Sequence, residues 1–369
     1  MMSARIKVTD ALDAIEYIYE HHMTDGLPVI PPTEARVGEF LDCVGLQPSH
    51  VVGVVTERAR AITAEKLAIN AVMAGCLPTY MPVLVAAVEA LCDPAFRFNH
   101  LASTGSPWPL LVVSGPAVRE LSMNHGMFLF GSANRANATL GRAISLLLWN
   151  CCEVRPDAIQ RGHLGTPQRF SFCIAENPDT AWEGLNEWEG YDRQTSAVTI
   201  SSSEPYCLVR TEATTPRGIL APIVNGIAKH TFWPGCYVVV IPPNIEKHLV
   251  EQGWTKRRIR DHIFENCRRT IKDLKEDARW GRNTSAFEGD LSDLVPVEPE
   301  DDKRWVYLFK KNPGLDRAVF HEACLDRRQD ILVVAAGGDA GFCVGIVPPY
   351  GVSTNPVTRP VKTPREQRG

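Results

Sequence analysis

Three continuous apolar runs constrain the fold of this chain most strongly. They read LLVVSGP at residues 110–116, CYVVVIPP at 236–243 and ILVVAAGG at 331–338, and each ends in glycine or proline. Strands that are apolar at every position are typical of sheets covered on both faces, and the loops at strand ends commonly gather around a site. The runs therefore predict buried strands whose ends surround one site.

Segments with helical periodicity lie between these runs. Apolar residues three and four positions apart predict helices over 10–22, 33–45, 63–76, 79–92, 138–150, 219–229, 245–253 and 255–278. Further strands are expected at 51–55, 169–175, 197–201, 206–210 and 305–309. Strands interleaved with helices predict an α/β fold, with a mixed α+β architecture as the alternative.

The length and composition allow two domains. The chain has 369 residues and 44% of them are hydrophobic, enough for two cores. The segment 177–193 shifts toward Trp, Glu, Gly and Asp, which predicts a boundary between domains at 1–190 and 191–369 that are related or intertwined. The first would carry the loop cluster 103–142. The second would carry a glycine turn at 337–341, interpreted as a hairpin turn, and a mobile basic tail from Thr358.

Charge and cysteine content exclude several classes of function. A net charge of −4 argues against nucleic acid or an anionic membrane as the main partner. No apolar run reaches membrane-spanning length and no secretory signal is present, so a cytoplasmic protein is expected. The basic run KRRIR at 256–260 is interleaved with acids and is interpreted as a solvated helix face. The eleven cysteines lack a CxxC pair and are expected to be reduced and mostly buried.

The stretch 99–142 is the best candidate for a binding site. Glycines, hydroxyls, amides and arginines crowd its loop positions, and such groups bind small anions, above all at a helix N-terminus. Asn137 or Thr139 could cap the helix that follows. The predicted substrate-binding residues are Ser103, Thr104, Gly105, Asn124, Arg135, Asn137 and Arg142.

Candidate catalytic groups come from three other places. Cys76 ends a predicted helix that also carries Glu65, and Cys173 and Glu176 end a predicted strand. His100 precedes the glycine loop and could act as a general base. A packing role is the alternative for both thiols, and a surface role for the histidine. The cofactor is left unknown: no nucleotide-binding motif occurs, and a metal is possible although no ligand spacing supports one.

Several phrases together resemble the bacterial family associated with UGSC-motif (seleno)proteins. They include TDGLPVIPPTEARV, AEKLAINAVMAGCLPTYMPVLVAAVEAL, STGSPWPLLVVSGP, RANATLGRAISLLLWN and AGGDAGFCVGIVPPYGVSTNPVTRPV. The resemblance implies a small partner protein that carries the UGSC or CGSC motif, because neither motif occurs in this chain. The family suggests no specific reaction.

The sequence therefore leads to two hypotheses. The first is an enzyme, or the large subunit of one, that acts on a small polar or anionic substrate by lyase, hydrolase or thiol-dependent chemistry. The second is a non-catalytic scaffold that binds and activates a small thiol or selenol partner. An oligomer is expected in either case.

Overall fold

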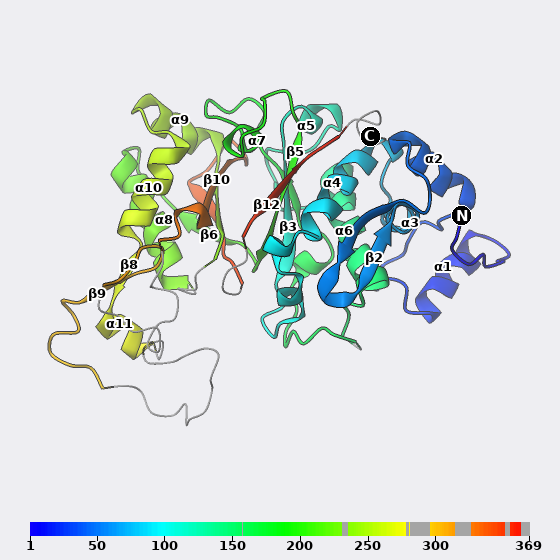
Figure 1. Ribbon diagram of the computed structural model, residues 1–369. Helices are drawn as coiled ribbons and strands as arrows, with labels where there is room; N and C mark the ends of the chain where they lie inside the picture. Colours follow the sequence, from blue (N-terminus) through cyan, green and yellow to red (C-terminus); the bar gives the residue numbers. More distant parts are fainter. Residues whose placement is uncertain are drawn as a thin grey trace.

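The computed structural model describes residues 1–156, 158–230, 235–277, 280, 296–313, 326–350 and 355–362. Helices alternate with strands along the chain, and two four-stranded mixed sheets lie side by side at the centre of the molecule (Figure 1). The prediction of an α/β fold is confirmed. No helix of the described residues is long and apolar enough to cross a membrane.

The first half of the chain contains seven α-helices and five strands among its described residues. The helices are α1 (Ala11–Glu20), α2 (Glu34–Val44), α3 (Ala64–Ala74), α4 (Met81–Leu91), α5 (Ala117–Glu120), α6 (Arg135–Cys152) and α7 (Leu185–Trp188). The strands are β1 (Val51–Val55), β2 (Arg60–Thr63), β3 (Trp108–Ser114), β4 (Cys173–Ala175) and β5 (Ala197–Ser203).

The second half repeats the alternation. Its described helices are α8 (Pro216–His230), α9 (Pro243–Glu251), α10 (Lys256–Asn266) and α11 (Ile271–Glu276). Its strands are β6 (Cys207–Arg210), β7 (Tyr237–Ile241), β8 (Arg268–Thr270), β9 (Trp305–Tyr307), β10 (Ile331–Ala335), β11 (Cys343–Val347) and β12 (Val357–Pro360).

The two large sheets have the same order of strand directions. In the first sheet, β12-β5-β3-β4, β3 runs parallel to β4 and antiparallel to β5, which is antiparallel to β12. In the second sheet, β10-β7-β11-β6, β7 runs parallel to β10 and antiparallel to β11, which is antiparallel to β6. The helices match as well: α4 packs against β5, β12 and α6, as α8 packs against β11, β6 and α10. The chain thus consists of two related α/β units.

The two units exchange their last strands. β6 follows β5 directly in sequence but pairs with β11 in the second sheet, and β12 follows β11 but pairs with β5 in the first. The expected boundary at 190/191 therefore does not separate the sheets, because β5 and β12 both lie beyond it. The composition shift at 177–193 reflects a local change in residue types. It does not report which strands pair, because strand pairing depends on contacts between residues far apart in the sequence.

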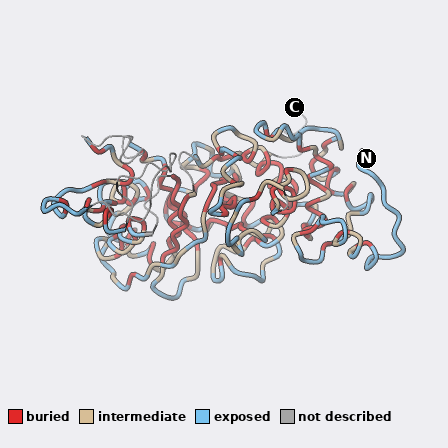
Figure 2. Tube along the Cα trace, turned by 90° about the horizontal axis from the view of Figure 1, so that it is seen from below, coloured by how far each residue is buried: buried red, intermediate tan, exposed pale blue. Residues whose placement is uncertain are grey.

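The second sheet is buried on both faces. Val238 and Val240 belong to the hydrophobic core of the first unit, while Val239 and Ile241 belong to the core formed with α8, α9 and α10. Burial is concentrated along the strands of both sheets (Figure 2). Burial of both faces explains why β7 and β10 are apolar at every position.

The carboxyl ends of four parallel strands meet where the two sheets adjoin. The edge strands β4 and β10 are joined there by a hydrogen bond from Asn177 N to Ala335 O, of 2.7 Å. Because β3 is parallel to β4 and β7 is parallel to β10, all four strands end at this junction. The ends of β3, β7 and β10, which the sequence predicted to surround one site, thus do meet, and a site at this junction stays a prediction.

The helix N-termini follow local capping rules, and the predicted start of one helix, α6, is corrected. Asp10, Thr33 and Thr63 accept hydrogen bonds from the first-turn amides of α1, α2 and α3. Helix α6 begins earlier than predicted and is capped by Asn134 rather than by Asn137 or Thr139. The apolar pattern from 138 onward did not include this polar first turn.

The predicted long helix at 255–278 is wrong. Helix α10 ends at Asn266, β8 follows, and α11 starts afresh at Ile271. A capping box between Thr270 and Asp273 starts the second helix, and Arg269 pairs with Val306 of β9. The solvated face predicted for 256–260 is also only partly correct, because Lys256 is buried.

Three further predictions are corrected. Strand β4 covers only residues 173–175 of the expected 169–175, since Pro167–Arg169 forms a 3-10 turn. Residues 337–341 do not form a hairpin turn, because β7 lies between β10 and β11. Residues 358–360, expected in a mobile tail, belong to β12, while residues 363–369 lie outside the described part of the chain.

Candidate functional site

The two arginines predicted to bind an anion are held by the protein itself. Arg135 donates from Nε to Gly75 O (3.0 Å) and from Nη2 to Cys76 O (3.4 Å), which ties the start of α6 to the end of α3. Arg142 forms a bidentate pair with Asp25, at 2.9 Å from Nε and 2.8 Å from Nη2. Arg142 is thus paired with a carboxylate, whereas Arg135 is exposed and is bonded to backbone carbonyls.

The amides and hydroxyls of the predicted anion site are also engaged. Asn137 accepts from Asn124 N and donates to Asn124 O, both at 2.8 Å, so the two predicted residues fix each other. Ser103 donates to the Tyr350 hydroxyl. A Cβ on Gly105 would lie 2.0 Å from the Tyr350 ring, so only glycine fits against it. The structure therefore gives these residues positioning roles.

The two candidate thiols are buried. Cys76 donates from Sγ to Thr139 O (3.3 Å), and burial raises the pKa of its thiol to about 12. Burial also raises the pKa of Cys173, with a smaller contribution from nearby Cys76. A thiol with so high a pKa is protonated at neutral pH, and the thiolate is the nucleophilic form. The packing alternative fits both residues.

Glu65 and His100 are hydrogen-bonded neither to each other nor to the two thiols among the described residues. Glu65 accepts hydrogen bonds from the backbone amides of Met2 (2.8 and 3.0 Å) and Ser3 (3.1 Å). Its pKa is lowered, because these hydrogen bonds outweigh the opposing effect of burial. His100 is half-buried, and burial, with a smaller effect of Arg97, lowers its pKa.

Glu176 lies at the junction of the two sheets, directly after β4. Its carboxylate accepts from Lys256 Nζ of α10 at 2.6 Å, from Leu185 N, and from Ala335 N at 3.4 Å. The side chains of Glu176 and Lys256 are only 3% and 1% exposed. Glu176 also lines a cavity of about 320 Å³, whose wall includes Asn177. The pair joins the two units and leaves no net charge at the floor of this cavity.

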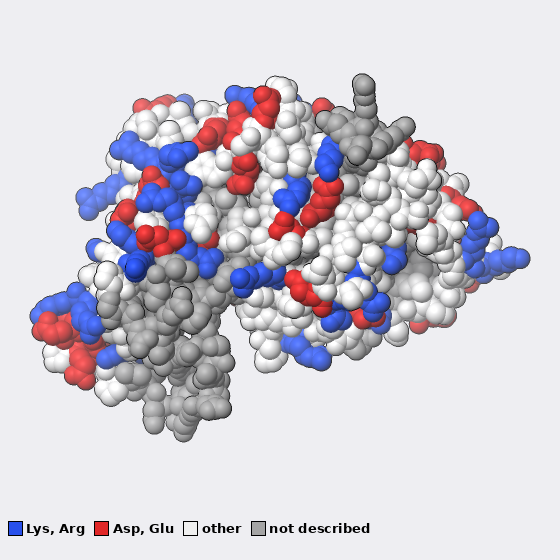
Figure 3. Space-filling model, viewed as in Figure 1, with Lys and Arg blue, Asp and Glu red and all other residues white. Residues whose placement is uncertain are grey.

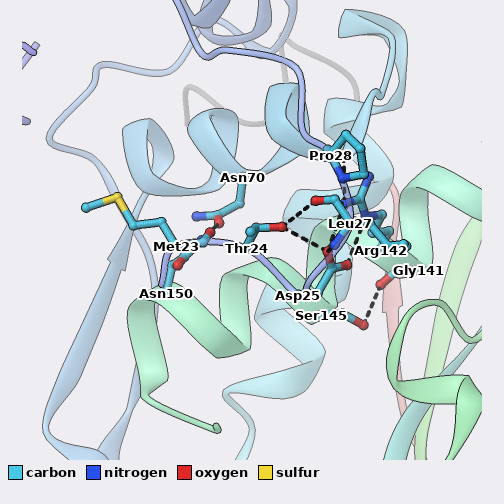
Figure 4. Close-up of polar contacts among 10 residues, drawn as sticks. All are labelled: Met23, Thr24, Asp25, Leu27, Pro28, Asn70, Gly141, Arg142, Ser145 and Asn150. Carbon is cyan, nitrogen blue, oxygen red and sulfur yellow. Dashed lines mark hydrogen bonds and ion pairs between the residues drawn. The ribbon is translucent and has the colours of Figure 1, made fainter. Parts of the chain in front are cut away.

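The Asp25–Arg142 pair belongs to a network that fixes residues 23–28 against α6 (Figure 4). Arg142 Nη2 also donates to Pro28 O at 3.0 Å. Asn150, two turns further along α6, donates to Met23 O at 3.1 Å and to Asn70 Oδ1 at 2.8 Å. The network holds the segment TDGLP, part of the family resemblance, as a rigid wall.

A second cavity, here called the Trp108 pocket, opens beside this wall. Its volume is about 310 Å³, and it lies between α6, the start of β3, Ser106, Pro156 and the segment 160–170. Its lining residues are Asp25, Ser106, Trp108, Ser145, Trp149, Pro156, Gln160, Gly162, His163, Leu164, Gly165, Thr166, Arg169 and Phe170. Pockets of this size with apolar walls and a few placed polar groups are typical ligand sites.

Arg169 is the charged residue of the Trp108 pocket that has no acidic partner among the described residues. Its Cζ lies 4.0 Å from the centroid of the Trp108 ring, and Trp108 Nε1 in turn donates to Ser145 Oγ at 2.8 Å. Its Nη1 is buried, and no described residue accepts a hydrogen bond from it. Burial lowers the pKa of Arg169 to about 10, so the side chain remains a cation at neutral pH. The one carboxylate of the lining, Asp25, is already paired with Arg142.

Sequence reasoning missed the residues that line this pocket. The segment 169–175 was interpreted as a strand, so Arg169 was not considered as a ligand-binding group, and Ser106 and Trp108 were overlooked beside the glycine loop. One signal was present: the phrases TDGLP, STGSPWP and RANATLGRAISLLLWN all contribute to the wall or to its support.

The described residues contain no cluster of three His, Cys, Asp or Glu side chains arranged to hold a metal.

Basic and acidic side chains are interspersed over the second unit (Figure 3). Arg258 and Arg260 of α10 lie over the rings of Trp254 and Trp188. The basic run at 256–260 is thus divided among a buried pair, aromatic contacts and solvent.

Comparisons with protein-family models, with curated proteins and with solved structures gave no match. The fold and the pocket themselves define the class: a two-unit α/β protein whose first unit has a surface pocket that contains Arg169.

Proposed function

We propose that this chain is an enzyme, or the large subunit of one, that takes a small anionic substrate in the Trp108 pocket. The observation that carries the proposal is the unpaired Arg169 guanidinium, with Nη1 buried and without a described partner, at the wall of a cavity of about 310 Å³. A donor that is buried without an acceptor is costly, and a bound oxyanion would supply the missing acceptor.

The shape of the pocket supports a ligand with an apolar body. Trp149 and Phe170 line it, and the face of Trp108 is covered by Arg169. In a ligand that joins a carboxylate or similar oxyanion to an apolar group, the oxyanion would pair with Arg169 and the apolar group would pack against the aromatic walls. His163 lies in the same lining, and imidazole is the commonest general acid or base in lyase and hydrolase chemistry.

Titration calorimetry with phenyl-bearing anions tests the proposal. Benzoate, phenylphosphonate and benzenesulfonate offer three oxyanions on one body, and benzamide is the neutral control. At least one anion should bind in preference to benzamide, and Arg169→Ala should weaken that binding by about 2 kcal/mol, which is roughly thirtyfold. Arg161→Ala is the matched control, because Arg161 is exposed on the same loop. Equal binding by wild type and Arg169→Ala would refute the proposal.

A second candidate is a scaffold for a small thiol or selenol partner protein. The observation favouring it is that Cys76 and Cys173 are both buried with raised pKa, so neither candidate thiol is suited to act as the nucleophile and a partner protein would supply one. Co-purification with a CGSC-type protein, and turnover only in its presence, would support the scaffold over the autonomous enzyme.

A further inference from the structure

The Ser106 side chain stands out within the Trp108 pocket. It is 2% exposed, and its Oγ has no hydrogen-bond partner among the described residues. Its backbone has φ of +61°, in the left-handed region that residues other than glycine rarely adopt. Strained backbone with an unsatisfied buried hydroxyl, both at a pocket wall, is typical of functional positions.

The surrounding loops are built to hold Ser106 in this conformation. Gln160 accepts from the backbone amides of Arg161 and Gly162, both at 2.9 Å, and donates to Leu101 O at 2.9 Å. A Cβ on Gly162 would lie 1.8 Å from Ser106 Oγ, so a glycine is required at 162 for the hydroxyl to keep its place. The loop beside the hydroxyl is thus clamped to the segment that precedes Ser106.

An unsatisfied hydroxyl alone would not indicate a ligand contact. Ser114 Oγ is likewise buried without a described partner, but Ser114 lies in β3 and does not line the Trp108 pocket. Ser106 differs because it shares its pocket with a second unsatisfied donor, Arg169 Nη1. Two unpaired donors at one cavity fit one acceptor with several lone pairs, such as a carboxylate or phosphonate.

We infer that Ser106 is a second anchor of the anionic ligand, with its hydroxyl donating a hydrogen bond to the oxyanion that Arg169 binds. This inference rests on the proposed function and adds a positioning residue to it. The ligand class is a small molecule whose oxyanion head accepts from a hydroxyl and a guanidinium and whose apolar body contacts Trp149 and Phe170. The left-handed backbone at 106 holds the hydroxyl in place before the ligand arrives, which reduces the entropy lost on binding.

The test compares Ser106→Gly, Ser106→Ala and Ser114→Ala by calorimetry with the phenyl anion that the wild type binds. Ser106→Gly removes the hydroxyl and relieves the backbone strain, so its unfolding temperature should equal or exceed that of the wild type. Both Ser106 variants should raise the dissociation constant about tenfold, and Ser114→Ala should leave it unchanged. Binding of benzamide should be nearly the same in all variants.

The outcomes separate the two proposals. If Arg169→Ala loses anion binding while Ser106→Gly retains the wild-type dissociation constant, the role of Ser106 is refuted and the proposed function stands. If no phenyl anion binds the wild type in preference to benzamide at millimolar concentration, both are overturned. A loss of affinity confined to Ser106→Ala, with Ser106→Gly unaffected, would indicate a change in backbone conformation and would also refute the inference.

Discussion

Glu176 after β4 and Lys256 at the start of α10 form a buried ion pair of 2.6 Å that joins the two units of the chain. The first unit supplies the acid and the second the base. At 3% and 1% exposure, neither side chain can exchange its partner for water. Each charge therefore depends on the other, and the pair fixes how the carboxyl ends of β4 and β10 meet.

Removal of one partner should destabilise the protein strongly. Lys256→Met leaves a buried carboxylate without its cation, and we expect a loss of about 3–5 kcal/mol in the free energy of unfolding, measured by urea denaturation. The double variant Glu176→Leu with Lys256→Met should recover much of this loss. The exposed pair Arg119–Asp179 is the control, since Arg119→Ala should cost under about 1 kcal/mol. Equal costs for the two pairs would contradict the interpretation.

The affinity for the phenyl anion should depend on pH through Arg169. Burial lowers the pKa of this guanidinium to about 10, so it is charged below that pH and neutral above it. Anion binding should therefore be constant between about pH 6 and 8 and weaken as the pH rises through about 10. Calorimetry with benzamide at the same pH values reports whether the pocket remains intact. Anion affinity that does not change up to pH 11, roughly one unit above that pKa, would rule out Arg169 as the cation.

Cys76 and Cys173 should resist alkylation in the folded protein. Burial raises the pKa of Cys76 to about 12 and raises that of Cys173 as well, so both thiols are protonated and shielded. Iodoacetamide followed by peptide mass spectrometry should label the half-exposed Cys343 and leave these two unmodified until denaturant is added. Rapid labelling of Cys76 in the folded protein would restore it as a candidate nucleophile.

A side chain at position 162 should disturb the Trp108 pocket. The Cβ of Gly162→Ala would lie 1.8 Å from Ser106 Oγ, so the hydroxyl must move. We expect a loss of about 1–3 kcal/mol in the free energy of unfolding, together with weaker anion binding. Gly38→Ala in α2 is the control: nothing lies within 4 Å of its added Cβ, and it should stabilise the helix by about 0.5–1 kcal/mol. An unchanged stability of Gly162→Ala would mean that Ser106 is not tightly held.

Truncation before β12 should unfold the first sheet. A chain that ends at residue 356 loses buried Val357, the hydroxyl contact of 2.9 Å between Thr358 and Thr199, and the pairing of β5 along one edge. The free energy of unfolding should fall by about 3 kcal/mol or more, as measured by circular dichroism during denaturation. A chain that ends at residue 362 keeps β12 and serves as the control. Equal stability of the two chains would show that the exchanged strand is dispensable.

The local structure of this protein was largely determined by its sequence. Apolar periodicity located most of the helices, and the helices that start after Asp10, Thr33 and Thr63 begin at capping residues, because both signals act over a few neighbouring residues. The continuous apolar runs identified β3, β7 and β10 as buried strands. Where the pattern spanned a break, as at 255–278, the sequence reading missed the capping box at Thr270 that divides the segment.

The site was decided by the tertiary structure. Arg135 and Arg142 have the side chains of ligand-binding residues, but the fold brings backbone carbonyls and Asp25 to them and so engages both. Arg169 gave no signal in the sequence, and it lines a pocket only because residues far apart in the chain come together around it. Local patterns report which elements form, whereas the partners of a charged group depend on contacts remote in sequence, which the sequence alone does not reveal.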